Sequence, residues 1–197
     1  MNGLRKMCSA PSKKNSLLRF RLTGVQVLFG LLFVLVALNS GVARDIPPPF
    51  DLSWGVRSSS VERMLSEMEG LSLTQKSSSR RGEAWTVMGF PQEHLARAIL
   101  HFDGRGLLYE VELQYEIPEL NPERFKDYAN TLRSTLESRY GSGRLFDREE
   151  SRQGGATVIF EGYEWTGTST VLRMIHFSAT RRNDFYNVAS LHYRRRS

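Results

Sequence analysis

Four histidines are the side chains best suited to metal binding or acid–base chemistry in this 197-residue sequence: His94, His101, His176 and His192. If the strands proposed below alternate regularly, His101, His176 and His192 share one face of a sheet with Gln114. Their spacing matches no HExxH or other known zinc motif. His101 and His176 also occupy equivalent places in two similar stretches, each just before a phenylalanine. The sequence therefore favours exposed strand histidines over a metal site.

Glu110 and Glu112 are the best pair of residues for carboxylate chemistry, because they fall on one face of a predicted strand. Glycoside hydrolysis needs two convergent carboxyl groups. Glutamates on the wet face of an antiparallel strand are mostly solvated, which is the alternative interpretation. Together with His101 and His176, the two glutamates would build the site of a small envelope hydrolase or another protein that acts on small molecules.

Nucleophilic serines and phosphate-binding loops are not indicated. No serine lies in G-x-S-x-G or S-x-x-K. The glycines at 104–106 and 154–155 lack the pattern of a nucleotide-binding loop. We therefore predict no catalytic, cofactor-binding or metal-binding residue, and no cofactor.

Charge is unevenly distributed along the chain, whose formal net charge is +6 from 27 bases and 21 acids. Residues 1–43 hold six bases and no acid, so residues 44–197 balance at 27 − 6 = 21 bases against 21 acids. This balance argues against nucleic-acid binding. Residues 103–123 carry six acids and one base, whereas residues 171–197 carry six bases and one acid. The two segments are suited to steering association between copies or with a partner; a solvated surface is the alternative.

The three tryptophans have different expected roles. We expect Trp54 to pack beneath the first helix, whereas the sequence assigns no definite place to Trp85. Trp165 falls near a hairpin end, where it is either an exposed interface anchor or an ordinary hairpin aromatic.

In the first half of the body, a helix of about ten residues is predicted from Ser59. Ser59 and Glu62 have the spacing of a capping box, and apolar residues follow at helical intervals. A polar loop is expected over 75–82. Strands are then expected over 84–90, 95–102 and 107–115, the last two joined by a hairpin turn at 103–106. The third strand alternates, with one apolar face made of Leu107, Tyr109, Val111, Leu113 and Tyr115.

The second half repeats this order. A helix begins at Asn121-Pro122, a typical cap followed by proline, and ends near Gly141. Strands are expected over 144–148, 156–163, 170–178 and 185–193. We therefore predict an α+β fold made of two tandem α-β-β-β units, 51–117 and 118–197, that form an antiparallel sheet with helices packed on one face.

The N-terminal segment has the anatomy of an export signal. Basic residues precede an apolar run over 25–38, and small residues follow it, so residues 1–43 read as a signal peptide cleaved before Arg44. An uncleaved anchor over 22–43 in the inner membrane is the alternative, and it would be the only membrane contact. Residues 44–50 contain three prolines and read as an extended spacer. The single cysteine, Cys8, precedes the apolar run, so the body has no disulfide or thiolate site.

Several motifs in this order resemble those of small exported bacterial α/β proteins, most of which have no assigned function. They are Trp54-Gly55-x-x-Ser58, Gly89-Phe90-Pro91, the Asp103-Gly104 hairpin, Tyr140-Gly141 and a strand that ends in Tyr193. In architecture this group is similar to the tandem modules of β-lactamase inhibitory protein and to small outer-membrane assembly lipoproteins. The resemblance spans most of 51–197 and implies a sheet whose uncovered face binds another protein. The chain departs from both in lacking a lipid-attachment cysteine and disulfides.

These observations predict an exported protein, periplasmic or extracellular, that is a non-enzymatic protein-binding module with an open sheet face. The expected partner is another envelope protein, and a homo-oligomer is possible. The alternatives are the envelope hydrolase described above and a small-ligand-binding protein with a cavity between sheet and helices.

Overall fold

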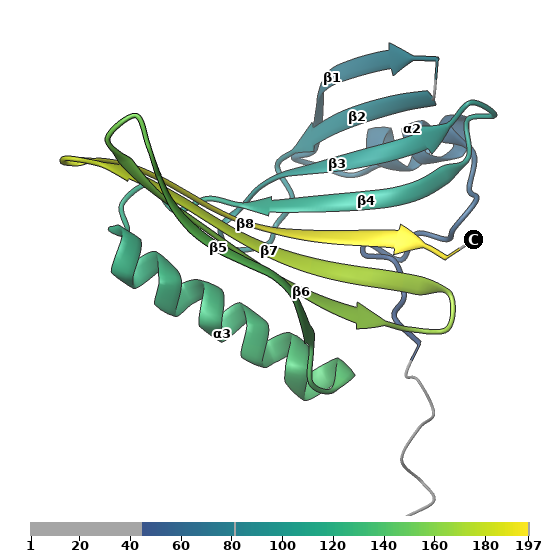
Figure 1. The fold of residues 1–197 in the computed structure, drawn as a ribbon. Helices are drawn as coiled ribbons and strands as arrows, with labels where there is room; N and C mark the ends of the chain where they lie inside the picture. The colour runs from purple at the N-terminus through teal and green to yellow at the C-terminus, as the bar shows by residue number, and fades with distance from the viewer. Residues whose placement is uncertain (1–44, 81, 197) are drawn as a thin grey trace, which may run out of the picture. The chain divides into compact units, whose positions relative to one another are not determined.

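One helix and four strands, followed by a second helix and four more strands, make up the fold in the computed structural model, which describes residues 45–80 and 82–196 (Figure 1). The first group is α2 (Ser58–Glu67), β1 (Ser72–Ser79), β2 (Gly82–Met88), β3 (Leu95–Asp103) and β4 (Leu108–Tyr115). The second is α3 (Pro122–Tyr140), β5 (Arg144–Gln153), β6 (Ala156–Thr166), β7 (Thr170–Arg181) and β8 (Asp184–Arg195).

All eight strands belong to one antiparallel sheet, in the order β1-β2-β3-β4-β8-β7-β6-β5. The join between the two groups is the pairing of β4 with β8, where Leu113 lies opposite Leu191. The fold is of the α+β type, but the predicted pair of tandem α-β-β-β units with helices packed on one face is wrong. The strands form a single sheet with a shared core, and the described residues form one compact unit.

A row of apolar side chains crosses six strands on one side of this sheet, which we call the buried face. Paired positions in register link Trp85, Leu100, Val111, Tyr193, Leu172 and Trp165, and each side chain is at most 8% exposed. A fully buried leucine in such a row contributes roughly 2 kcal/mol to folding. The opposite side, which we call the open face, carries the alternate residues of the same strands.

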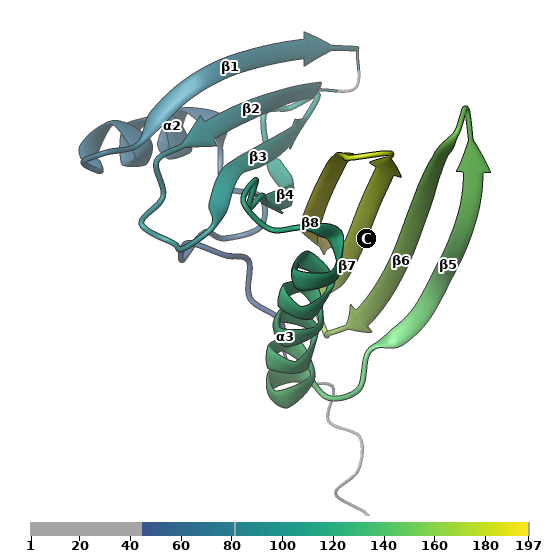
Figure 2. The same ribbon diagram turned by 90° about the vertical axis from the view of Figure 1, so that its left-hand side faces the viewer.

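The two helices cover different parts of the sheet. α2 buries Val61 and Leu65 near the β1–β4 end, and α3 runs along β7 and β8 with Phe125 and Ala129 buried (Figure 2). The predicted cap of α3 is confirmed, because the Asn121 side chain accepts a hydrogen bond from the Arg124 backbone N–H at 2.9 Å.

The predicted capping box of α2 is wrong. The helix is capped by Arg57 without a side-chain hydrogen bond. Glu62 instead accepts a 2.6 Å hydrogen bond from Lys76 Nζ, and the ammonium of Lys76 lies 4.1 Å from the centroid of the Trp85 ring. The glutamate therefore ties the helix to the sheet rather than to its own first turn.

The polar segment expected as a loop over 75–82 mostly forms β1. Each of three hydroxyl groups, those of Thr74, Ser77 and Ser79, donates to a carbonyl of β2. Because β1 is an edge strand exposed along its whole length, it shows no apolar alternation. Its polar composition is therefore the same as that expected of a loop.

The proline-rich segment expected as a spacer contributes to the core. Ile46 is 1% exposed, and the Phe50 ring stacks on Phe90 with centroids 4.0 Å apart. Ser169 Oγ also donates to Asp45 Oδ1 at 3.0 Å. The predicted signal peptide or anchor, 1–43, lies outside the described residues. Within the described ranges, neither helix has the length and apolar character needed to span a membrane.

Candidate functional site

The open face carries a row of side chains across its centre, all of them polar except the first. Positions in register link Ile99, Glu112, His192, Arg173, Glu164 and Arg144 across β3, β4, β8, β7, β6 and β5. At one end of the row, Glu164 accepts hydrogen bonds from Arg144 at 2.6 Å and from Arg173 at 2.8 Å. One carboxylate thus holds two arginines from neighbouring strands in place.

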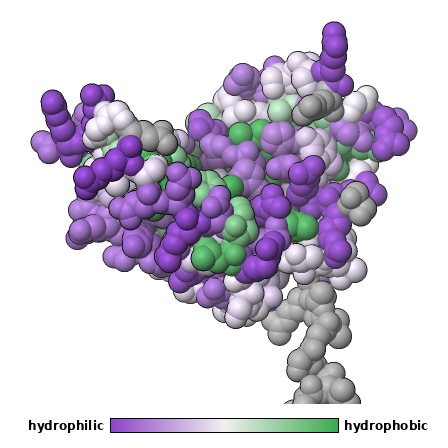
Figure 3. All heavy atoms as spheres, in the orientation of Figure 1, coloured by the Kyte–Doolittle hydropathy of each residue, from purple (hydrophilic) through white to green (hydrophobic). Residues whose placement is uncertain are grey.

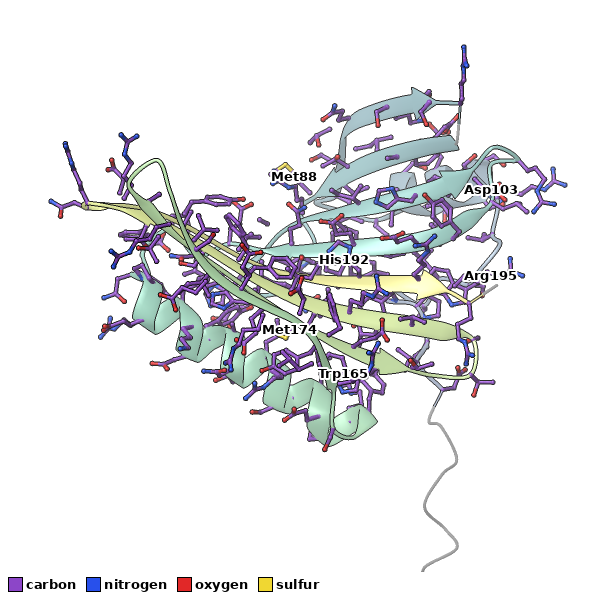
Figure 4. All side chains as sticks on the ribbon, viewed as in Figure 1. Met88, Asp103, Trp165, Met174, His192 and Arg195 are labelled. Carbon is purple, nitrogen blue, oxygen red and sulfur yellow. The ribbon has the colours of Figure 1, made fainter. Side chains whose placement is uncertain are left out.

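At the other end of the row, two histidines meet two glutamates. His192 Nδ1 lies 3.5 Å from Glu110 Oε1 and 3.9 Å from Glu112 Oε2. His101 Nε2 lies 3.9 Å from Glu112 Oε2. All four side chains are between 16% and 25% exposed. We call these four residues the His–Glu cluster; Figure 4 shows His192 near the middle of the sheet.

The cluster is tied to its neighbours by amide and guanidinium groups. Gln114 Nε2 donates to Glu112 Oε1 at 2.5 Å, and Arg97 Nε donates to Gln114 Oε1 at 2.5 Å. Arg97 also pairs with Glu116 at 3.2 Å. These contacts fix the orientation of Glu112, whose side chain is 16% exposed.

Both glutamates of the cluster are held in the charged form. The pKa of Glu110 is lowered mainly by its hydrogen bond with His192, against the opposing effect of burial. For Glu112, burial acts to raise the pKa, but His101 and Gln114 together bring it below its ordinary value. A general acid needs a raised carboxyl pKa, so these glutamates are suited to binding cations rather than to donating protons.

The structure places the sequence-predicted site residues on two faces. His101, Glu110, Glu112 and His192 come together on the open face, with Gln114 beside them. His176 does not, and its predicted place on that face is wrong. It lies opposite Glu161 and Ala189 in register, 4% exposed, with its ring 5.8 Å from that of Phe125 of α3. The similar sequence positions of His101 and His176, each just before a phenylalanine, therefore do not correspond to the same face of the sheet.

His94 also lies away from the cluster. It precedes β3 in a left-handed backbone conformation, with φ 62°, and its ring meets that of Tyr128 edge-on at 5.5 Å. Its nearest acid is the exposed Glu93, at 3.3 Å.

The apolar face predicted for 107–115 is wrong at its first residues. The register shifts between β3 and β4, so that His101 pairs with Glu110 but Phe102 pairs with Leu108. Tyr109 is the extra residue of this bulge. Leu108 therefore fills the core at 0% exposed, and Tyr109 lines the hollow of the open face.

A groove of about 870 Å³ lies beside the cluster on the open face, over β4, β8 and β7. Five arginines line it, and we call it the arginine groove: Arg105, Arg173, Arg194, Arg195 and Arg196. Sequence analysis found the basic segment 171–197 but missed Arg105, which the β3–β4 turn brings in from the acidic segment. Figure 4 shows Asp103 of that turn and Arg195 of β8 toward the same end of the strands.

The other half of the open face is apolar. Phe160 and Phe177 pair across β6 and β7, and Phe177 pairs with Val188 of β8. With Val158 and Ile175 they form what we call the apolar patch, whose members are neither fully buried nor fully exposed. Figure 3 shows apolar side chains set among polar ones on the visible side. The alternation of β7 signals this patch, because both faces of the strand are partly apolar.

The tryptophans are anchors of the fold rather than of a surface. Trp165 is 3% exposed and donates through Nε1 to the Gly141 carbonyl at 2.8 Å, so it is not an exposed hairpin residue. Trp85 is also buried. Trp54 is partly buried and donates to Thr170 Oγ1 at 2.8 Å.

The site can pair with charged groups and bury apolar ones. Among the described residues, no group of three or more His, Cys, Asp or Glu side chains is arranged to hold a metal ion. Comparison with family models, curated proteins and solved structures finds no match for this chain.

Proposed function

We propose that this chain is an exported envelope protein that binds another protein through the open face of its sheet, without catalysing a reaction. The observation that carries the proposal is the apolar patch, which lies on a sheet face that neither α2 nor α3 covers. A contiguous, partly exposed apolar surface rimmed by polar residues is typical of a protein-binding site.

The composition of the open face fits a protein partner. Protein interfaces are enriched in aromatic residues and arginine, and their apolar centre is surrounded by a polar rim. Here Phe160 and Phe177 lie in the patch, and the exposed Tyr186 ring, 6.2 Å from that of Phe177, extends it towards the β7–β8 turn. The hollow over β5, β6 and β7 has a volume of only about 250 Å³, which suits one protruding side chain better than a whole ligand.

Export remains a proposal from the sequence of residues 1–43. It places the body in the periplasm or outside the cell, with a retained anchor over 22–43 as the alternative. N-terminal sequencing of the protein from cells decides between them, because cleavage leaves Arg44 as the first residue.

The hydrolase alternative required His101, His176, Glu110 and Glu112 in one pocket. His176 lies on the opposite face, and both glutamates have lowered pKa values. We therefore do not propose that site.

Photo-crosslinking in cells of the source organism tests the binding proposal. A benzoylphenylalanine replaces Phe160 or Ile175 in the tagged full-length chain, and Lys126 on the exposed side of α3 serves as the control position. We expect one envelope protein, identified by mass spectrometry, to be captured from both open-face positions and not from Lys126. Capture of nothing from either open-face position would overturn the proposal.

A further inference from the structure

The arginine groove has more positive charge than its own surroundings neutralise. Arg173 is paired with Glu164, and Arg105 with Asp103 at 3.3 Å. Arg194, by contrast, has its nearest acid, Glu110, at 3.9 Å. The remaining two arginines, Arg195 and Arg196, have no carboxylate within 4 Å among residues 45–80 and 82–196.

The guanidinium groups without a close carboxylate are accessible. The Arg194 side chain is 64% exposed, and Arg195 and Arg196 are exposed as well. Arg196 donates one Nη1 hydrogen bond to the Gly167 carbonyl at 2.9 Å, which positions its guanidinium group but supplies no negative charge. A planar guanidinium held in this way is suited to pairing with a carboxylate through two parallel hydrogen bonds.

The walls of the groove are apolar between the arginines. Val171 and Ile175 of β7 alternate with Arg173, and Tyr109 of the β4 bulge lines the same groove. An occupant that presents carboxylates and apolar side chains in turn matches this lining. A dense inorganic polyanion would leave the apolar walls without a partner. The positive charge of the groove also excludes residues 1–44 of this chain as the occupant, because those residues carry seven bases and no acid.

We propose that the arginine groove binds an extended acidic segment of the partner protein, in which Asp or Glu residues alternate with apolar ones. This inference rests on the proposed function and names the chemistry of the partner. Arg194 and Arg196 pair with its carboxylates, while Tyr109, Val171 and Ile175 contact the intervening side chains.

The test measures binding of a fluorescein-labelled octapeptide of alternating Glu and Val to the full-length protein by fluorescence anisotropy. The matched probe has Gln in place of Glu. We expect the acidic peptide to bind and the Gln peptide not to bind. The double variant Arg194→Gln, Arg196→Gln should weaken binding by about tenfold or more, the size expected for loss of charge-assisted hydrogen bonds. The control Arg124→Gln, on exposed α3 surface, should leave binding unchanged.

Four outcomes would overturn the inference. Equal binding of both peptides, or equal binding to the double variant, would show that the arginines do not recognise carboxylates. Binding of hexametaphosphate without binding of the acidic peptide would assign the groove to a phosphate polyanion. Self-association that the double variant abolishes would make the occupant a second copy, through its acidic segment 103–123.

Crosslinking in the double-variant background separates this inference from the proposed function. If the Phe160 and Ile175 positions capture the partner from the double variant as well as from the wild type, the acidic-segment inference is wrong and the binding function stands. If the peptide binds and no open-face position captures a protein, the binding function is wrong.

Discussion

At the residue scale, the two faces of the sheet have opposite effects on the charge of their titratable side chains: the open face favours the charged form and the buried face disfavours it. Glu110 and Glu112 are mostly buried on the open face, yet the histidines beside them keep them charged. His176 is buried on the other face, where its Nε2 has no hydrogen-bond partner among the described residues. Burial is the main cause that lowers the pKa of His176, with Lys126 acting in the same direction and Glu161 opposing it.

His176 should make stability sensitive to pH just below neutrality. Its ordinary pKa is 6.5 and its folded pKa is lower, so the unfolded chain takes up a proton that the folded chain refuses. The contribution of neutral His176 to the free energy of unfolding is therefore fully present above pH 6.5. It is lost as the pH falls from 6.5 to the folded pKa, by at most about 1.4 kcal/mol per pH unit. Urea unfolding at pH 7.5 and 5.5 measures this loss.

His176→Phe removes this proton uptake and keeps a ring beside Phe125, so we expect it to lose less stability than the wild type between the two pH values. His94→Gln, at a half-exposed position, is the control and should behave as the wild type. An equal loss in the wild type and His176→Phe would contradict the assignment.

At the element scale, the backbone ends of β2 are the most constrained part of the fold. Gly89 follows β2 with φ +91°, and a Cβ built on it would lie 1.9 Å from the backbone carbonyl oxygen of Gly70. No flexible side chain is available to move aside there. The segment after α2 and the end of β2 therefore approach as closely as two backbones can.

Gly89→Ala is expected to destabilise the protein by about 2 kcal/mol or more, because it adds both a steric overlap and an unfavourable φ. The matched control is Gly104→Ala in the β3–β4 turn, where an added Cβ meets nothing within 4 Å. Thermal unfolding by circular dichroism compares the two. A change of melting temperature that is the same for both variants would contradict the prediction.

Local chemistry made some elements predictable from the sequence. The β3–β4 turn was predictable because the Asp103 carboxylate accepts two backbone N–H groups within four residues, and α3 because Asn121 caps it. β1 was not, because an edge strand exposed on both faces has no period-two signal. The place of Tyr109 depends on a bulge set by the partner strand, and that of His176 on a register that no local pattern records. The candidate site was predicted in part: His101, Glu110 and Glu112 were grouped together, but with His176 in the place that His192 takes, and the arginine groove was not predicted.

At the scale of the whole molecule, the β4–β8 pairing decides whether the sheet behaves as one body. The pairs Val111–Tyr193 and Leu113–Leu191 place four buried side chains at this join, each at most 8% exposed. The core on both sides of the join is continuous. We therefore expect the two groups of strands to unfold together.

Leu191→Ala tests this expectation at the join. Loss of a buried leucine side chain costs about 2–5 kcal/mol. The cost should lower the unfolding midpoint reported by Trp85, in the first group, and by Trp165, in the second, by the same amount. Single-tryptophan versions of the protein in urea provide the two signals. Separate transitions for the two reporters would show that the groups fold independently.

The strand order has a consequence for the newly made chain. β4 is complete some 70 residues before the synthesis of its neighbour β8 begins. Throughout that interval the inner edge of β4 offers unpaired amide and carbonyl groups beside the apolar Val111 and Leu113, which is a template for pairing with other chains. A chain that folded as it emerged would spend this time prone to aggregation. Keeping it extended until β8 is present, as a holding chaperone does, removes that hazard.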